Sequence, residues 1–274
     1  MERPTGPSPN KRQTALITGA SAGIGYEFAR VFAREGHALV LVARNKEKLD
    51  QIARELKDQF AVSVRVMPQD LSQPGAPEEI FRELQKDSVA VDILVNNAGF
   101  GGYGFFFETG LKPELEMLQV NAAALTHLTK LFLKGMVERK RGKILNVAST
   151  AAFQPGPLMA VYFATKAYVL SFSEALANEL KGTGVGVTVL CPGATQSEFQ
   201  QRAGIERMKL LKAGMMDAET VAKAGYRGMM QNKTVVIPGI GNNIFAFLIR
   251  LGPRSWVTTI VRFLQEKTKQ SHGG

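Results

Sequence analysis

The stretch "ALITGASAGIG" (15–25) decides the fold that we predict for this chain. A short apolar run of strand type passes into a glycine-rich turn, and a segment with helical periodicity follows it. Gly19, Gly23 and Gly25 let the backbone turn tightly and approach a pyrophosphate, for which a helix N-terminus supplies amide donors. The spacing, G-x-x-x-G-x-G, differs from the usual dinucleotide-binding G-x-G-x-x-G. Because such a turn can also be purely structural, the rest of the chain must decide its role.

Six more short β-rich runs follow the first, and longer segments with helical periodicity separate them. Near-continuous apolar strands alternating with helices are typical of a parallel sheet that helices cover on both faces. We therefore predict an α/β fold, a doubly wound, seven-stranded parallel sheet in three layers. The expected strands are 15–18, 38–43, 62–67, 91–96, 143–148, 185–191 and 234–238.

The 274 residues show no internal repeat, low-complexity tract or linker, and 45% of them are hydrophobic, so we expect one catalytic domain over 13–240. Residues 1–12 are expected to be a disordered lead-in without a signal peptide, and 241–274 a C-terminal helical extension. The single cysteine, Cys191, excludes an internal disulfide and favours a reducing, cytoplasmic location.

The chain is basic, with 34 lysines and arginines against 24 acidic residues. This excess favours an anionic partner, which could be a nucleic acid, a phosphorylated cofactor or an acidic membrane surface. The basic residues are scattered, without a dense tract or interleaved aromatic repeat, and we therefore predict no nucleic-acid binding.

The end of the second expected strand, "LVLVARN" (39–45), bears on the choice of cofactor. A ribose 2′-hydroxyl calls for a carboxylate at this place, whereas a 2′-phosphate calls for a cation. Ala43 stands where the acid would be, and Arg44, which follows it, can bind a phosphate with two hydrogen bonds. We predict that NADP(H) is preferred over NAD(H), with a second contact from Ser21, although Arg44 could also be an ordinary surface arginine.

A lysine stands among apolar residues in "VYFATKAYVL" (161–170), where its desolvation costs free energy unless its charge is used. Tyr162 and Lys166 are four residues apart, so they share one face of the expected helix. Ser149 ends the fifth expected strand on the ligand side, and Asn121 lies within the helical segment before that strand.

These residues resemble the classical short-chain dehydrogenase/reductase family. The motifs "TGASAGIG" (18–25), "NNAG" (96–99) and "PG" (192–193), together with Asn121, Ser149 and the Tyr162-x-x-x-Lys166 pair, occur in that family's order and spacing. The resemblance spans about 13–240. It implies a Rossmann-type sheet, a nicotinamide cofactor, and oxidation or reduction of an alcohol/carbonyl pair. We also expect a homodimer or homotetramer and no metal site.

The chemistry of the four residues agrees with this resemblance. A tyrosine with an ordinary pKa of about 10 is a poor base at pH 7. A cation at ~4 Å and an effective dielectric constant of ~20 favours the phenolate by about 4 kcal/mol, so we predict that Lys166 brings the pKa of Tyr162 near neutrality. The resemblance further implies that Lys166 binds the nicotinamide ribose, that Ser149 holds the substrate oxygen, and that Asn121 holds a water in a proton relay.

The resemblance also assigns the other cofactor contacts. Asp70 and Leu71 would frame the adenine, and the backbone of Thr195 would meet the carboxamide. Thr195 and Ser197 depart from the residues common in the family. Ala22 stands where some NADPH-preferring members carry a basic residue, so the cofactor preference depends mainly on Arg44. The full expected set is Gly19, Ser21, Gly23, Ile24, Gly25, Arg44, Asp70, Leu71, Asn97, Ala98, Gly99, Tyr162, Lys166, Pro192, Gly193 and Thr195.

Two segments are expected to form the mouth of the site, 99–110 and a lid over 195–216. Their aromatic and methionine residues favour a large apolar ketone, aldehyde or secondary alcohol. A non-catalytic nicotinamide-binding regulator or scaffold is the alternative, and the motifs do not separate a hydroxysteroid or 3-oxoacyl reductase from a general carbonyl reductase. The apolar candidates are Phe100, Tyr103, Phe105, Phe106, Phe107, Phe153, Met159, Phe199, Met208, Leu210, Leu211, Met215 and Met216.

The segment 243–267 is apolar but contains Arg250, Arg254 and Arg262. No stretch of it approaches the ~20 consecutive apolar residues that a membrane-spanning helix needs. We predict two short amphipathic helices, separated at Gly252-Pro253. These helices either pack on the domain or on another subunit, or they make a peripheral membrane contact with anionic lipid.

Overall fold

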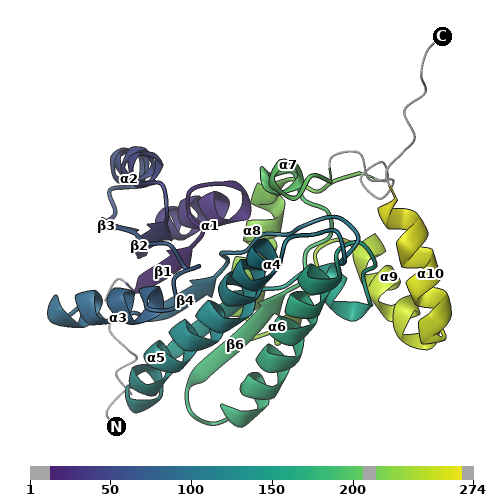
Figure 1. The fold of residues 1–274 in the computed structure, drawn as a ribbon. Coiled ribbons are helices and arrows are strands. Elements are labelled where there is room, and N and C mark those ends of the chain that lie inside the picture. The colour runs from purple at the N-terminus through teal and green to yellow at the C-terminus, as the bar shows by residue number, and fades with distance from the viewer. Residues whose placement is uncertain (1–12, 206–213, 267–274) are drawn as a thin grey trace, which may run out of the picture.

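A computed structural model describes residues 13–205 and 214–266, and Figure 1 shows its fold. Seven parallel strands form one sheet in the order β3-β2-β1-β4-β5-β6-β7. The predicted doubly wound sheet of the Rossmann type is confirmed. The strands are β1 (Thr14–Thr18), β2 (Ala38–Ala43), β3 (Val64–Pro68), β4 (Ile93–Asn96), β5 (Gly142–Val147), β6 (Val185–Leu190) and β7 (Val235–Val236).

Helices cover both faces of the sheet, which gives the three predicted layers (Figure 1). One core contains the buried faces of α1 (Gly23–Arg34), α2 (Lys46–Phe60) and α8 (Ala218–Met230). The core on the other side contains those of α3 (Ala76–Lys86), α5 (Leu125–Glu138) and α6 (Ala160–Glu179), and α4 (Leu111–Leu118) packs against α6.

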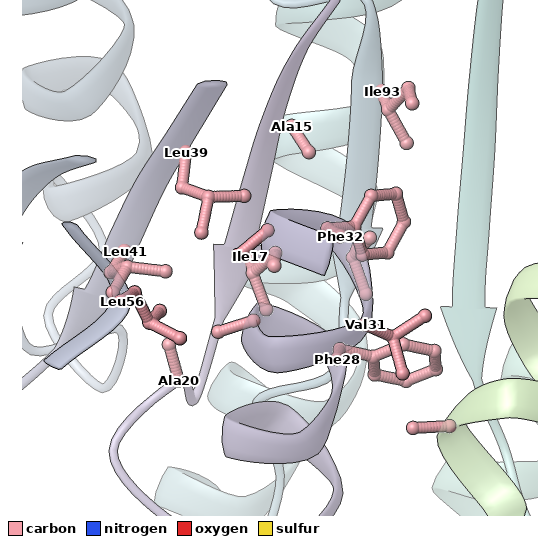
Figure 2. Packing of buried hydrophobic residues seen from close by; sticks show 14 of the residues in the cluster. Ala15, Ile17, Ala20, Phe28, Val31, Phe32, Leu39, Leu41, Leu56 and Ile93 are labelled. Atoms are coloured by element: carbon pink, nitrogen blue, oxygen red, sulfur yellow. The ribbon is translucent and has the colours of Figure 1, made fainter. Parts of the chain in front are cut away.

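The strands are apolar along their whole length because neighbouring residues point to opposite, equally buried faces. In β1, Ala15 and Ile17 belong to the core under α1, whereas Leu16 belongs to the core on the other side. Figure 2 shows Phe28 and Phe32 of α1 beside these β1 side chains. This two-sided burial explains why the strand positions could be predicted to within about two residues.

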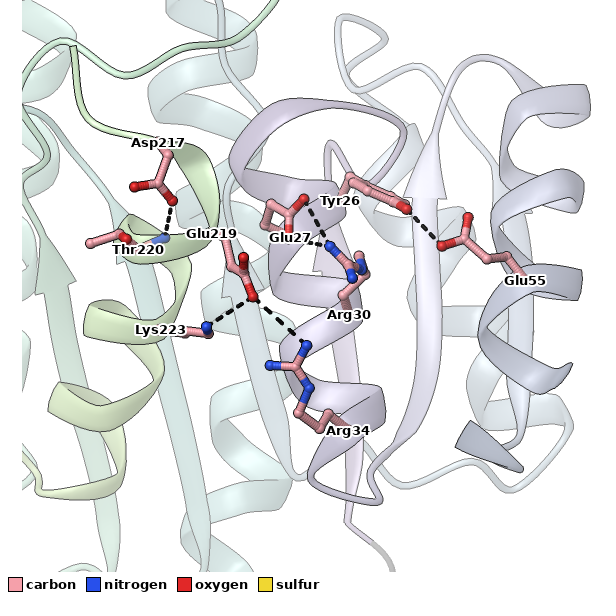
Figure 3. A network of polar contacts seen from close by, with 9 residues as sticks. All are labelled: Tyr26, Glu27, Arg30, Arg34, Glu55, Asp217, Glu219, Thr220 and Lys223. Atoms are coloured by element: carbon pink, nitrogen blue, oxygen red, sulfur yellow. Dashed lines mark hydrogen bonds and ion pairs between the residues drawn. The ribbon is translucent and has the colours of Figure 1, made fainter. Parts of the chain in front are cut away.

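The outer surfaces of α1, α2 and α8 are joined by polar contacts (Figure 3). Tyr26 of α1 donates its hydroxyl hydrogen to Glu55 of α2 at 2.7 Å. Glu219 of α8 pairs with Lys223 at 2.8 Å and with Arg34 of α1 at 3.7 Å. Exposed pairs of this kind contribute at most about 1 kcal/mol each, so the two cores supply most of the stabilisation.

The connections after β1 and β4 leave toward opposite faces, and these strands are neighbours in the sheet. A crevice therefore opens at their carboxyl ends, which is where ligands bind in such sheets. Shorter elements surround it: a π-helical turn η1 (Gln119–Ala124), a 3₁₀ turn η2 (Thr150–Phe153), α7 (Phe199–Ala203), α9 (Ile240–Leu251) and α10 (Arg254–Gln265).

Part of the predicted organisation lies outside the described residues. These parts are the lead-in 1–12, residues 206–213 of the expected lid, and the chain end 267–274. Within the described ranges, no helix combines the length and the apolarity that a membrane crossing requires. The C-terminal segment instead contains the two short helices α9 and α10, which are separated at Gly252-Pro253.

Candidate active site

A cleft of about 770 Å³ occupies the crevice at the carboxyl ends of the strands. All sixteen residues that we expected to bind the cofactor line it, and so does Ser149. Asn121 is the one expected catalytic residue that does not line the cleft, because it lies buried behind its wall. The structure therefore brings together residues that the sequence separates by up to 176 positions, from Gly19 to Thr195.

The glycine-rich turn approaches its neighbours too closely to accept side chains. Gly19 has a φ of +66°, and a Cβ there would lie 2.9 Å from the side-chain nitrogen of Asn97. A Cβ on Gly25 would clash with the carbonyl oxygen of Gly19. No side chain of the described residues caps the start of α1, and its first turn contains no acid. The turn thus presents open backbone and unopposed helix amides to the cleft, as a pyrophosphate requires.

Two polar residues hold this turn to the end of β4. The hydroxyl oxygen of Thr18 accepts the backbone N–H groups of Asn97 and Ala98, both at 3.0 Å. The side-chain amide of Asn97 donates to the Thr18 carbonyl oxygen at 2.9 Å. Asn97 therefore both lines the cleft and fixes the distance between its two central strands.

The ribose end of the cleft carries Arg44, which is exposed and directly follows β2. Within 13–205 and 214–266, its guanidinium forms no ion pair or hydrogen bond. Lys48 of α2 lies close by in the sequence and pairs with Glu198 at 2.9 Å. This ion pair joins α2 to the residue before α7, and Glu198 itself lines the cleft. Among the described residues that line the cleft, Arg44 is thus the cation that remains unpaired.

Tyr162 and Lys166 lie one turn apart on the buried side of α6. The Lys166 ammonium donates to the Val147 carbonyl oxygen at 2.9 Å and lies 5.7 Å from the centre of the Tyr162 ring. Ser149, the residue before η2, donates its hydroxyl hydrogen to the Pro192 carbonyl oxygen at 3.4 Å and is near enough to Tyr162 to lower the pKa of the phenol. Its Oγ also accepts the backbone N–H of Ala151 at 3.1 Å, which fixes the hydroxyl beside the tyrosine.

The predicted near-neutral pKa of Tyr162 is wrong in this structure. Burial raises the pKa of Tyr162 to about 12, and the hydrogen bond from Ser149 offsets only part of this effect. Burial also lowers the pKa of Lys166 to about 8. Burial penalises the charged phenolate, and this desolvation is the largest effect on the pKa of Tyr162. At pH 7 the tyrosine is protonated and the lysine is charged, an arrangement suited to an acid.

Asn121 lies in the π-helical turn η1 and is held by three hydrogen bonds. Its side-chain oxygen accepts the backbone N–H of Phe100 at 3.1 Å, and its amide donates to the Phe100 carbonyl oxygen at 2.9 Å. The same amide donates to Thr165 of α6 at 3.1 Å. Asn121 thus joins the segment after β4 to the helix that carries Tyr162. Its oxygen keeps a second lone pair for a water.

The predicted mouth of the site is only partly correct. Phe100, Met159 and Phe199 line the cleft, but Phe105, Phe106 and Phe107 do not and are exposed instead. Tyr103, Phe153, Met215 and Met216 also lie outside the lining, and Met208, Leu210 and Leu211 lie outside the described residues. Gly101 of this segment permits close packing, because a Cβ there would lie 2.8 Å from the Phe199 ring.

The helices α9 and α10 complete the apolar end of the cleft, which sequence reasoning missed. They contribute Phe245, Val261 and Leu264 together with the polar Asn242 and Gln265. The apolar residues of 240–265 occur on more than one side of each helix, which was the signal available in the sequence. Packing on the domain was expected, but the sequence does not show which residues α9 and α10 would contact.

The cleft fits a nicotinamide dinucleotide. The side-chain-free turn at Gly19 and Gly25 and the uncapped start of α1 suit a pyrophosphate. Arg44 stands at one end, and Tyr162 and Lys166 at the other. The fold and the site together define a nucleotide-binding oxidoreductase of the Rossmann type.

Comparisons with known proteins agree on the family. A family model described as short chain dehydrogenase matches residues 13–207. The chain belongs to the short-chain dehydrogenase/reductase family. It is 35% identical to the very-long-chain 3-oxoacyl-CoA reductase of Homo sapiens over 195 residues, which are 68% of this chain and 61% of that protein. The matched region spans 58 to 61% of the length of the first curated relatives.

Two solved structures are similar over most of the chain. A short-chain dehydrogenase from Sphingobium yanoikuyae in complex with NADPH is 35% identical, with a TM-score of 0.78 over 86% of this chain and 91% of that one. The bulky-bulky ketone specific alcohol dehydrogenase from Comamonas testosteroni is 31% identical, with a TM-score of 0.76 over 97% of this chain and 98% of that one.

Proposed function

We propose that the protein is an NADP(H)-dependent oxidoreductase that acts on bulky, apolar ketones or the corresponding secondary alcohols. The observation that carries this proposal is that Tyr162, Ser149 and Lys166 line the same cleft as the glycine-rich turn. The relatives named as 3-oxoacyl-CoA reductases and as a bulky-ketone dehydrogenase support the same class of reaction.

In the reducing direction, we propose that Tyr162 donates a proton to the substrate oxygen. The bound nicotinamide supplies the hydride for the carbonyl carbon. Ser149 orients the substrate oxygen through a hydrogen bond, because its hydroxyl is already beside that of Tyr162. The charged Lys166, whose ammonium lies 5.7 Å from the centre of the Tyr162 ring, favours the phenolate that remains.

Asn121 acts in this proposal as a positioning residue. Its bonds to Phe100 and Thr165 hold the cleft wall against the helix that carries Tyr162. The remaining lone pair on its side-chain oxygen fits the water of the proton relay expected from the sequence.

We expect Arg44→Ala to weaken NADPH binding by about 1.5–3 kcal/mol, because it removes a hydrogen bond to a charged group. NADH binding should change little, since NADH has no 2′-phosphate. Titration of both cofactors into wild type and variant measures this difference. Arg54→Ala is the matched control, because Arg54 is an exposed arginine on α2, the helix that follows Arg44, and it does not line the cleft. Equal losses for NADPH and NADH would contradict the assignment of Arg44.

The apolar end of the cleft predicts a preference for long substrates. Across a series of ketones or 3-oxoacyl thioesters, kcat/KM should rise with chain length, by at most about 0.8 kcal/mol per buried methylene. Phe245→Ala should flatten this rise, because Phe245 lines the cleft, whereas Phe247→Ala should not, because Phe247 points to solvent. A wild-type enzyme that ignores chain length, or that prefers small polar carbonyls, would contradict the proposed substrate class.

A further inference from the structure

The helices α9 and α10 are apolar on two sides. One side of each faces the protein, where Ala246, Val257 and Val261 are buried and Phe245 and Leu264 line the cleft. An ordinary surface helix would present polar residues on the opposite side. Here that side is apolar as well, and packing against the rest of this chain does not explain why.

The opposite side presents seven large apolar residues to solvent, which we call the outer apolar face. On α9 they follow the spacing i, i+4, i+7, i+8, and on α10 the spacing i, i+4, i+7, so each set forms one helical stripe. Their exposed fractions lie between 55% and 81%. The seven residues are Ile240, Ile244, Phe247, Leu248, Trp256, Ile260 and Phe263.

The exposed phenylalanines after β4 extend this face. The guanidinium of Arg262 on α10 lies 4.9 Å from the ring centre of Phe105, and the Phe105 and Phe107 rings are 5.4 Å apart. Phe107 is 82% exposed. In Figure 1, α9 and α10 lie at the end of the molecule opposite α2 and α3. So many large exposed apolar side chains on two consecutive helices and the neighbouring segment mark an interaction site.

The charges around this face indicate its partner. From Ile240 to Gln265 the sequence contains three arginines, Arg250, Arg254 and Arg262, but no aspartate or glutamate, and the chain as a whole has a net charge of +10. Glu266, the next residue, pairs with Arg262 at 3.8 Å. Arg254 is exposed at the start of α10, two residues before Trp256. Apolar side chains bordered by arginines, with a tryptophan among them, suit the boundary between headgroups and acyl chains of an anionic bilayer.

A second copy of this chain suits the surface less well. Two identical faces brought together by a twofold axis would place arginines of one copy near those of the other, and the one acidic residue beside them, Glu266 after α10, already pairs with Arg262 at 3.8 Å. We propose that the outer apolar face binds the surface of an anionic membrane, with α9 and α10 lying in the plane of the interface and not crossing it. The cleft-lining sides of the same helices would then face away from the bilayer, toward the active site.

Trp256 provides a direct test, because it is the only tryptophan in the chain and is 70% exposed. The full chain is mixed with vesicles of phosphatidylcholine alone or with phosphatidylglycerol added. With the anionic vesicles we expect the Trp256 emission to move to shorter wavelength and to be quenched by brominated acyl chains. Raising the salt from 0.1 M to 1 M, which shortens the Debye length from about 10 Å to about 3 Å, should weaken binding.

Two triple variants, checked for folding by circular dichroism, test whether vesicle binding depends on the outer apolar face or on any exposed apolar residues. Ile244→Ser, Phe247→Ser and Ile260→Ser together should weaken vesicle binding by at least about tenfold. Leu111→Ser, Leu115→Ser and Leu118→Ser remove equally exposed residues from α4 and should leave it unchanged. This test reads no enzyme activity, so its outcome is independent of the proposed function.

Three results would overturn the proposal. The first is an unchanged Trp256 emission with anionic vesicles at low salt. The second is equal binding by both triple variants. The third is a blue-shifted emission without vesicles that accompanies a dimer in sedimentation and disappears in the α9–α10 variant, since that result would assign the face to a second copy of this chain.

Discussion

Tyr162→Phe should lower kcat by about 10²- to 10⁴-fold while NADPH affinity stays nearly unchanged. The substitution removes only the phenolic hydroxyl, the group that would donate the proton, and the buried ring keeps its place. The expected loss belongs to kcat more than to KM, because the proton moves only in the transition state. Initial rates of NADPH oxidation with a long-chain ketone, together with a cofactor titration, measure both quantities.

Tyr168→Phe is the matched control for this substitution. Tyr168 lies on the same helix, is 42% exposed and shares a hydrogen bond with Thr126, so its hydroxyl is remote from the cleft. Its loss should leave kcat unchanged. If Tyr162→Phe retained nearly full activity, Tyr162 would not be the proton donor.

Gly25→Ala should abolish measurable NADPH binding and lower the free energy of unfolding by about 3 kcal/mol, the upper end of the cost of overpacking. The added methyl group would clash with the Gly19 carbonyl oxygen and lie 2.5 Å from the Asn97 side-chain nitrogen. Neither neighbour can move without displacing the glycine-rich turn from the end of β4. Chemical denaturation and a cofactor titration of the same variant measure the two losses.

Gly241→Ala is the control, because a Cβ at this α9 position meets nothing within 4 Å among the described residues. Alanine is also favoured over glycine inside a helix, so this variant should be as stable as the wild type or slightly more stable. A Gly25→Ala protein that bound NADPH as the wild type does would show that the cleft holds its cofactor elsewhere.

The sheet could be predicted from the sequence because its signal is local and repeated. Each strand is a short apolar run such as 38–43. Turn residues bound each run, and a segment with helical periodicity follows it. β7 was the exception in length, since only Val235 and Val236 form it. Its residues extend the sheet at its edge, where one side has no further strand.

The polar end of the site was predictable for a related reason. In a parallel sheet the residues after each strand gather at one edge, so Arg44, Asn97 and Ser149 could be placed together from their positions alone. The pKa of Tyr162 was not predictable in this way. It depends on how far burial outweighs a charge 5.7 Å away, and both quantities belong to the packed structure.

The apolar end of the site depends on contacts between distant segments. Phe105 and Phe107 occur in the same segment as Phe100, and composition did not separate those that face the cleft from those that face solvent. Phe245 and Val261 reach the cleft because α9 and α10 fold back over it. Helical periodicity shows that such helices have apolar sides, but it does not show where the helices lie.

Transfer of deuterium from NADPH to a substrate tests the central claim most directly. The protein is incubated with NADPH that carries two deuterium atoms at C4 of the nicotinamide and with a long-chain ketone, and the alcohol is analysed by mass spectrometry. We predict an alcohol with one deuterium on the carbinol carbon, formed by the wild type and by Tyr168→Phe but not at a comparable rate by Tyr162→Phe. Binding of NADPH without any labelled alcohol, across the whole series of ketones and 3-oxoacyl thioesters, would contradict the account and favour a cofactor-binding protein without catalysis.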